Sequence, residues 1–530
     1  MCGIWACIGK TAGDADTYIQ RLSRRGPEGF SVVDVHDNTL AFCRLAINGG
    51  ADDGMQPMHS SGVWWICNGE IYNWKDLGIP TTSESDCSVL GALWTKLRDT
   101  PSAFFRALDG VFAMVIYDAS TGITTVARDP YGVRPLFYAH GKGCVYISSE
   151  MKGLHDLSGY IRAVPPGTFM QFRKGLLLPL VETRWHATPW IKNPTYQDHS
   201  LARAAIRASL TTAVKKRMMS DRPVAALLSG GLDSSLVAAL VQKEMAVPLE
   251  TFSIGFAGSD DLRYARIVAD YIGSKHTEIQ VTPDDFFQAI PDVIRDIESY
   301  DITTVRASVG NWMVAKAIRE LSQAKVVFNG DGSDELFGGY KYFARAPDDQ
   351  TFEDECVRLL ENIHAFDVLR SDRCISSHGL EARTPFLDKQ FVALAMSLPT
   401  SLRRSGGMEK WVLRTAFQDE MLIPHEVLFR RKEAFSDGVS GPDMPWFEQI
   451  RARVAPLSSN WPMQSYRFSY LCPKTPESFY YRNIFHHFYG LGCQFVIPYM
   501  WMPRWSPETT DPSARTIKMD PVECVENEDK

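Results

Sequence analysis

The segment from Pro223 to Glu244 constrains the fold of this 530-residue chain more than any other. It begins with a continuous apolar run, Pro223–Leu228, which is typical of a strand buried on both faces. A glycine-bearing loop follows, and the helical pattern Ser234–Glu244 comes directly after the loop. A buried strand joined to a helix by a short loop is the repeating unit of a parallel sheet covered by helices. We therefore expect an α/β fold.

Strand and helix patterns also alternate on both sides of this segment. We predict helices over 201–218 and 262–272, strands over 251–254 and 325–328, and a mainly helical chain beyond about residue 350. The first 190 residues are β-rich instead. Strands are predicted at Ser31–Val35, Leu40–Leu45, Val63–Cys67, Val111–Tyr117, Ile123–Arg128 and Cys144–Ser148, with a helical segment at Asp86–Leu97. The polar, proline-bearing stretch Thr188–Pro194 is predicted to be a linker between two domains.

Composition favours a soluble globular protein, with 45% hydrophobic and 22% charged residues. The net charge of −7 argues against nucleic acid or a membrane surface as a partner, and neither a membrane span nor a secretory signal is recognisable. The eleven cysteines show no metal-binding spacing. We interpret all except Cys2 as buried free thiols in a reducing, cytoplasmic compartment.

Cys2 becomes the N-terminal residue once Met1 is removed. A free α-amine has a pKa of roughly 7.7–8.0, so at neutral pH it can serve as a general base. A thiol on the same residue then forms a self-contained pair of nucleophile and base. A cysteine at position 2 usually has no function, so this interpretation depends on other motifs in the chain.

The loop after the apolar run reads Ser229-Gly230-Gly231-Leu232-Asp233-Ser234-Ser235. Ligands of open α/β sheets bind where such loops leave the strands, and a helix N-terminus offers unpaired N–H groups to phosphate. The loop contains no lysine, so it is not the nucleoside-triphosphate loop that ends in GK[ST]. A glycine-rich turn without function is the alternative. The seven residues join a predicted buried strand to a predicted helix, and this setting favours a phosphate site.

This loop resembles the pyrophosphate loop of the ATP-pyrophosphatase enzymes, and together with Cys2-Gly3 it resembles the glutamine-hydrolysing asparagine synthetases. The resemblance implies two α/β domains. The first is an αββα sandwich of the N-terminal-nucleophile hydrolase type, and the second is a parallel sheet of the ATP-pyrophosphatase type with additional helices. We place an amidotransferase domain at 2–190, a linker at 191–200, a synthetase domain at 201–515 and a polar tail at 516–530.

The family's amidotransferase motif is matched by residues 68–73, Asn-Gly-Glu-Ile-Tyr-Asn. The resemblance assigns Cys2 as the nucleophile, and the Asn68 side chain and the Gly69 N–H as the oxyanion hole that acyl transfer requires. It assigns glutamine binding to Arg44, Asn68, Gly69, Glu70 and Asp86. Residues 24–28 and 128–136 resemble framework segments of the family.

In the second domain, residues 332–340 and the segment 431–438 around Lys432 are strong matches to the family. The resemblance assigns Asp233 and Asp334 to Mg²⁺, whose preferred ligands are hard oxygens, and Lys432 to neutralising the phosphates of ATP. The ATP-binding residues it implies are Leu227, Ser229, Gly230, Gly231, Asp233, Ser234, Ser235, Ile254, Asn329, Gly330 and Lys432. Segments 301–308 and 383–388 are similar to family segments that line the synthetase cleft, and residues 501–515 resemble the C-terminal end of the eukaryotic-type branch.

Asp331 is a departure from the family, which usually has a glutamate at this catalytic position. The charge is kept, but the side chain is one methylene shorter, and a displacement of about 1 Å can change a rate by orders of magnitude. We hypothesise that backbone adjustment or water compensates.

The activity implied is ATP-dependent synthesis of asparagine from aspartate, with ammonia taken from glutamine. Two alternatives stay open. One is an amidotransferase on the same scaffold that acts on a different carboxylate, and the other is a non-catalytic sensor of nucleotides or amino acids. The expected partners are glutamine, aspartate and ATP, and the oligomeric state stays open, a homodimer included.

Overall fold

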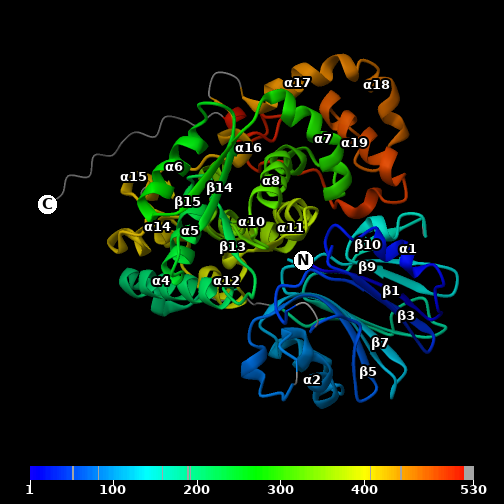
Figure 1. Cartoon of the computed structure of the whole chain (residues 1–530). Helices are drawn as coiled ribbons and strands as arrows, with labels where there is room; N and C mark the ends of the chain where they lie inside the picture. The colour runs from blue at the N-terminus through cyan, green and yellow to red at the C-terminus, as the bar shows by residue number, and fades with distance from the viewer. Residues whose placement is uncertain are drawn as a thin grey trace.

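The computed structural model describes residues 1–50, 53–81, 83–157, 159–187, 190, 192–405, 407–441 and 445–517. Part of the predicted linker (188, 189 and 191) and most of the predicted tail (518–530) lie outside the described residues. Figure 1 shows two parts that pack side by side, with the N-terminus between them. No helix in the described ranges is long and apolar enough to cross a bilayer.

The N-terminal part contains two six-stranded antiparallel sheets. The first has the order β10 (Ile161–Ala163), β8 (Phe137–His140), β9 (Val145–Ser148), β1 (Gly3–Ile8), β3 (Asn38–Cys43) and β2 (Phe30–Val35). The second has the order β12 (Val181–Arg184), β11 (Thr168–Arg173), β7 (Ile123–Arg128), β6 (Gly110–Asp118), β5 (Val63–Ile71) and β4 (Met58–Ser60). The helices of this part include α1 (Ala15–Gln20), the 3₁₀ turn η2 (Asp86–Val89), α2 (Leu90–Leu97) and α3 (Pro101–Ala107).

Alternating side chains of β1 build the layers. Ile4 faces the second sheet and shares a buried cluster with Ile66 of β5, whereas Trp5 points to the opposite face, where it stacks on Tyr18 of α1 with ring centroids 5.3 Å apart. The outer face of the second sheet is covered by α2 and α3, with Phe104 in the shared cluster. The order of layers is therefore helix, sheet, sheet, helix, which confirms the predicted αββα sandwich.

The C-terminal part is built on a parallel sheet, as predicted. Its order is β15 (Lys275–Gln280), β14 (Glu250–Gly255), β13 (Val224–Leu227), β16 (Val326–Phe328) and β17 (Glu381–Arg383). The flanking helices include α4 (His199–Lys216), α5 (Leu232–Glu244), α6 (Asp260–Ile272), α7 (Pro283–Ile297), α8 (Ile302–Leu321), α9 (Ser333–Phe337), α10 (Asp349–Asn362), α11 (Asp367–Ser376), α12 (Lys389–Ser397), α14 (Trp411–Ala416), α17 (Trp446–Leu457) and α19 (Pro476–Tyr489). The chain adds β14 and β15 on one side of β13, and then β16 and β17 on the other. The strand order therefore reverses between β13 and β16, where open α/β sheets bind ligands.

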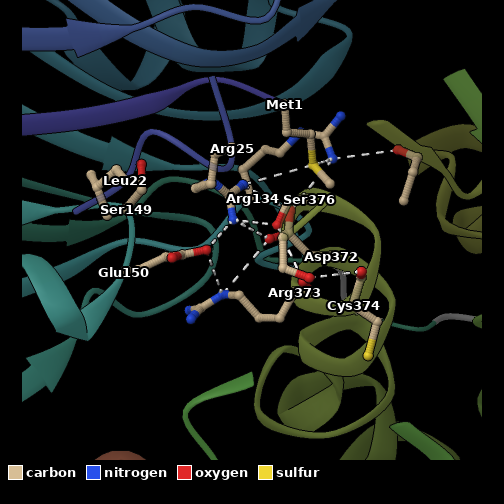
Figure 2. A network of polar contacts seen from close by, with 12 residues as sticks. Met1, Leu22, Arg25, Arg134, Ser149, Glu150, Asp372, Arg373, Cys374 and Ser376 are labelled. Carbon is tan, nitrogen blue, oxygen red and sulfur yellow. Dashed lines mark hydrogen bonds and ion pairs between the residues drawn. The ribbon is translucent and has the colours of Figure 1, made fainter. Parts of the chain in front are cut away.

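Buried ion pairs join the two parts (Figure 2). Arg25, which follows α1, donates from Nη1 to Glu150 and to Asp372 of α11, both at 2.7 Å. Arg373 donates to Glu298 at 2.5 Å, and Glu298 also accepts from the backbone N–H of Met151 at 2.8 Å. These side chains are at most 3% exposed. The Arg25–Asp372 pair and the hydrogen bond from Met151 to Glu298 cross the junction, whereas the pairs with Glu150 and of Arg373 with Glu298 each lie within one part.

Two candidate active sites

The first site surrounds Cys2, immediately before β1. Its Sγ lies 3.4 Å from the backbone nitrogen of Leu45, which donates to it, and its carbonyl accepts from Arg25 Nε at 2.9 Å. Burial raises the pKa of the thiol to about 11 in the chain that carries Met1. The Met1 amine is also buried, where it donates to Leu380 O at 3.1 Å, and burial lowers the pKa of this amine to about 6. The Met1 amine is therefore largely unprotonated at neutral pH.

Asn68 faces the same region from β5. Because side chains alternate along a strand, Asn68 continues the face of Ile66, and Cys2 packs against the buried cluster that contains Ile66. Both polar atoms of the Asn68 side chain are buried, and neither has a hydrogen-bond partner among the described residues. Buried amides in folded proteins are normally hydrogen-bonded. The unpaired amide is therefore ready to bind a ligand next to Cys2.

The backbone N–H of Gly69 points to the side of β5 away from β6, beyond the residues that pair with β4. Gly69 is opposite Phe112 in the sheet register, and Phe112 uses its N–H and C=O toward Asp129 on the other side. In an antiparallel sheet Gly69 therefore directs its N–H away from β6. At this edge Ile71 N–H donates to Asp86 at 2.6 Å and Cys67 N–H donates to Gln56 at 2.6 Å. Gly69 N–H lies between these two satisfied donors, beside the Asn68 amide.

Two buried acids and one buried arginine complete this site. Burial, Glu381 and Asp86 raise the pKa of Glu70 well above its usual range, and burial raises the pKa of Asp86 to about 6. Arg44 directly precedes Leu45, and its Nη2 donates to Gly50 O at 2.8 Å. The site thus combines acidic side chains with a basic one, as an amino-acid ligand with an ammonium and a carboxylate requires.

The second site is a cavity of about 210 Å³ at the switch between β13 and β16. Most of the predicted ATP and metal residues line it, namely Leu227, Ser229, Gly231, Asp233, Ser234, Ile254, Asn329, Gly330, Asp334 and Lys432. The predicted catalytic residue Asp331 lines it too. Gly230 and Ser235 are not in the wall of the cavity. Gly230 has a φ of +68° and packs against α6, and the Ser235 side chain is fully buried.

The loops after β13 and β16 touch each other across the cavity floor. A Cβ on Gly330 would lie 2.8 Å from the Cβ of Asp233, so this approach requires glycine. Ser333 donates to Asp233 Oδ1 at 2.8 Å. These contacts bring two motifs that are a hundred residues apart into one site.

Two lysines neutralise the paired aspartates of the cavity. Lys410 Nζ lies 2.6 Å from Asp233 Oδ2 and 2.7 Å from Asp334 Oδ1, and Lys432 Nζ lies 2.7 Å from Asp334 Oδ2. Burial alone would raise the pKa of Asp334, but Lys410 and Lys432 outweigh it and hold this pKa well below the usual range. Burial likewise opposes the charge of Lys432, but Asp334 and Asp233 raise its pKa. Lys410 belongs to no motif and was not predicted from the sequence.

The two aspartates fit the magnesium site that the resemblance implies, because a carboxylate oxygen from each converges on one cation, Lys410 Nζ. In the described part of the chain no group of three or more His, Cys, Asp or Glu side chains could hold a metal. An ion at Asp233 and Asp334 therefore needs further oxygen ligands. Phosphate and water are the ones with which proteins usually complete the coordination of Mg²⁺.

Asp331 is held by an arginine in the cavity wall. Arg370 Nη2 donates to Asp331 Oδ1 at 3.0 Å and to Asp367 Oδ1 at 2.9 Å. Burial raises the pKa of Asp331, and Arg370 opposes that shift. Nearby, Tyr340 Oη donates to Glu335 at 2.6 Å. The shorter side chain at this position is thus fixed by a direct ion pair.

The predicted position of segment 383–388 in the wall of the cavity is wrong. Thr303, Arg306 and Ala307 of segment 301–308 line the cavity, whereas no residue of 383–388 does. Segment 383–388 begins at the end of β17. It starts at the junction of the two parts, where Arg383 Nη2 lies 3.4 Å from Glu70 Oε2 of the N-terminal site. Residues 512–514 from the end of the predicted synthetase domain line the cavity, and so does Ile517 from the predicted polar tail.

Comparison with known proteins gives matches over nearly the whole chain. Residues 205–353 and 344–508 match the family model described as asparagine synthase, and residues 1–181 match that of the glutamine amidotransferase domain. The glutamine-hydrolysing asparagine synthetase of Gallus gallus is 40% identical over 98% of this chain and 99% of its own length. Those of Bos taurus and Homo sapiens are each 39% identical over 98% of both chains. Together with the two sites described above, these matches show that the chain belongs to the glutamine-hydrolysing asparagine synthetase family.

Proposed function

We propose that this protein converts aspartate to asparagine with ATP, using ammonia that its first site releases from glutamine. One observation carries the proposal. The residues of both family chemistries lie in a single chain and gather at two separate sites, one around Cys2 and one around the cavity at Asp233. The names of the related proteins support the same substrates.

At the first site the Cys2 thiol attacks the carboxamide carbon of glutamine, and the α-amine of Cys2 takes the thiol proton. Asn68 Nδ2 and the Gly69 N–H donate to the oxyanion. The amine then returns the proton to the leaving nitrogen, ammonia departs, and water releases glutamate from the thioester. Glu70 and Asp86 pair with the ammonium of glutamine, and Arg44 pairs with its carboxylate.

At the second site the β-carboxylate of aspartate attacks the α-phosphate of ATP, and pyrophosphate leaves. The phosphates lie on the loop 229–235, with Lys432 neutralising their charge. Asp233 and Asp334 would hold Mg²⁺, which would neutralise further phosphate charge. Adenylation is required because a free carboxylate has no usable leaving group. Ammonia then attacks the adenylate to give asparagine and AMP, and Asp331 lies in the wall of the cavity where this occurs.

We further propose a division of labour with an amidotransferase domain at 2–190 and a synthetase domain at 201–515. The segment between them docks on the second domain, because Asn193 N–H donates to Ser397 O at 3.0 Å and Lys192 pairs with Glu353 at 2.7 Å. A cytoplasmic location is supported by the cysteines, since the ten that the structure describes are all free thiols.

The test is to incubate the full chain with ATP, Mg²⁺ and glutamine, with and without aspartate, and to follow pyrophosphate and amino acids together. Aspartate-dependent pyrophosphate with equal asparagine and glutamate is expected. Cys2→Ala should abolish the use of glutamine yet keep synthesis from ammonium salts. Glutamate release without pyrophosphate would favour a different carboxylate acceptor, and nucleotide binding without either product would favour a sensor.

A further inference from the structure

Arg383 links the parallel sheet of the C-terminal part to the first site. It is the last residue of β17, and its side chain is fully buried. Its Nε donates to Glu381 at 2.7 Å, and its Nη1 donates to the carbonyls of Arg217 and Met219 at 2.6 and 2.8 Å. The remaining nitrogen, Nη2, lies 3.4 Å from Glu70 Oε2 and has no hydrogen-bond partner in the described part of the chain.

Glu70 lies in a group of charges that comes from several elements. Asp86 faces it from η2, Glu381 and Arg383 face it from β17, and Arg134 faces it from the segment before β8. Its Oε2 also accepts from the Asn48 amide at 2.6 Å. Burial and the two acids disfavour the charged form of Glu70, whereas the two arginines favour it. The ionised state of Glu70 therefore depends on a guanidinium that the other half of the protein supplies.

We propose that Arg383 is a positioning residue of the glutamine site, which orients Glu70 and balances its charge so that Glu70 can accept the ammonium of glutamine. The synthetase sheet then completes the amidotransferase site. The inference rests on the proposed function, which assigns Glu70 to glutamine binding. Arg383 itself contacts Glu70 and does not line the cavity for ATP.

Replacing Arg383 with glutamine removes the charge that faces Glu70. We expect the KM for glutamine to rise about 10- to 100-fold, the scale found for groups that orient metal-binding side chains. The kcat should change much less, because the interaction is made equally with ground state and transition state. The acid limb of the kcat/KM profile should move to higher pH, since Glu70 beside Glu381 and Asp86 would lose its proton less readily.

The experiment measures glutamate release by the full chain across pH, with ammonium-driven asparagine synthesis as a second readout. R383K, which keeps the charge, should recover most of the affinity for glutamine, and ammonium-driven synthesis should persist in both variants. The matched control is R373Q. Arg373 is equally buried at the same junction and pairs with Glu298, so this variant should lower the Tm and leave the KM for glutamine near the wild-type value.

An unchanged KM in R383Q, or an equal rise in R373Q, would overturn the proposal, because the effect would then be absent or would belong to the junction in general. If R383Q does not fold, E381Q provides the second test. It removes an acid beside Glu70 and keeps Arg383, so the acid limb should move to lower pH, and movement to higher pH would contradict the argument. A wild-type chain that releases no glutamate would instead refute the proposed function.

Discussion

Replacing Asn68 with alanine separates catalysis from stability at the first site. In the free protein the Asn68 amide has no partner in the described part of the chain, so the substitution breaks no existing hydrogen bond. Its proposed bond to the oxyanion forms only during the reaction. Losing one oxyanion-hole donor costs about 100- to 1,000-fold in kcat, equal to about 2.7–4 kcal/mol of transition-state stabilisation.

Stability should hardly change in the same variant. An unpaired buried polar atom costs about 1–3 kcal/mol, and its removal offsets the packing that is lost with the small side chain. We expect the free energy of unfolding to change by less than about 1 kcal/mol, or a few degrees in Tm.

The assay compares glutamate release, ammonium-driven asparagine synthesis and Tm in wild type, Asn68→Ala and Asn68→Asp. Asn68→Asp keeps the shape of the side chain and loses the donor, so it should be as slow as Asn68→Ala. Glutaminase activity within about threefold of wild type in Asn68→Ala, below the loss expected for any oxyanion donor, would refute the reasoning. A joint loss of both activities and of Tm would also refute it, because it would indicate a structural role.

Three further predictions concern Lys410, Asp331 and Asp86. Lys410→Met should lower ATP–pyrophosphate exchange about 100-fold, because it removes a cation from the wall of the cavity proposed to hold the phosphates, and exchange near the wild-type rate would exclude a role for Lys410. Asp331→Ala should lower ammonium-driven asparagine formation about 100-fold, whereas Asp331→Glu should change it less than about tenfold. A large gain in the glutamate variant with little loss in the alanine variant would contradict the hypothesis that backbone adjustment or water compensates for the shorter side chain. Burial raises the pKa of Asp86 to about 6, so its charged form is lost as the pH falls through 6, and the KM for glutamine should rise toward pH 5. Asp86→Asn should flatten that dependence.

Buried strands were predictable from the sequence, because burial on both faces leaves a continuous apolar run. The predicted strand Pro223–Leu228 is β13 at Val224–Leu227, and the helix predicted at 262–272 is α6 at Asp260–Ile272. β17 gave no such signal. Its sequence is Glu-Ala-Arg, and it is fully buried because Arg383 pairs with Glu381 and faces Glu70 from the other part of the chain. Pairing over this distance in sequence leaves no local pattern.

The same limit applies to the residues of the sites. Motifs specify residue types at fixed spacing, so the sequence alone predicted Asp233, Asp334 and Lys432. Lys410 lies 177 residues from Asp233 and has a left-handed backbone with φ of 58°, a feature that only the folded chain reveals. The number of partners around each acid is likewise a tertiary property.

The charged partners around each acid give the acids of the two sites opposite pKa shifts. Glu70 and Asp334 are both buried, and burial alone raises the pKa of any carboxyl. Glu70 has acids on two sides and shares its arginines with them, so its pKa stays raised. Asp334 has two lysines within 2.7 Å, so its pKa is held low. The first site therefore depends on charge that the junction must supply, whereas the second holds permanent charge for a cation and phosphates. Since the junction charges come from both parts of the chain, the two sites depend on one continuous fold.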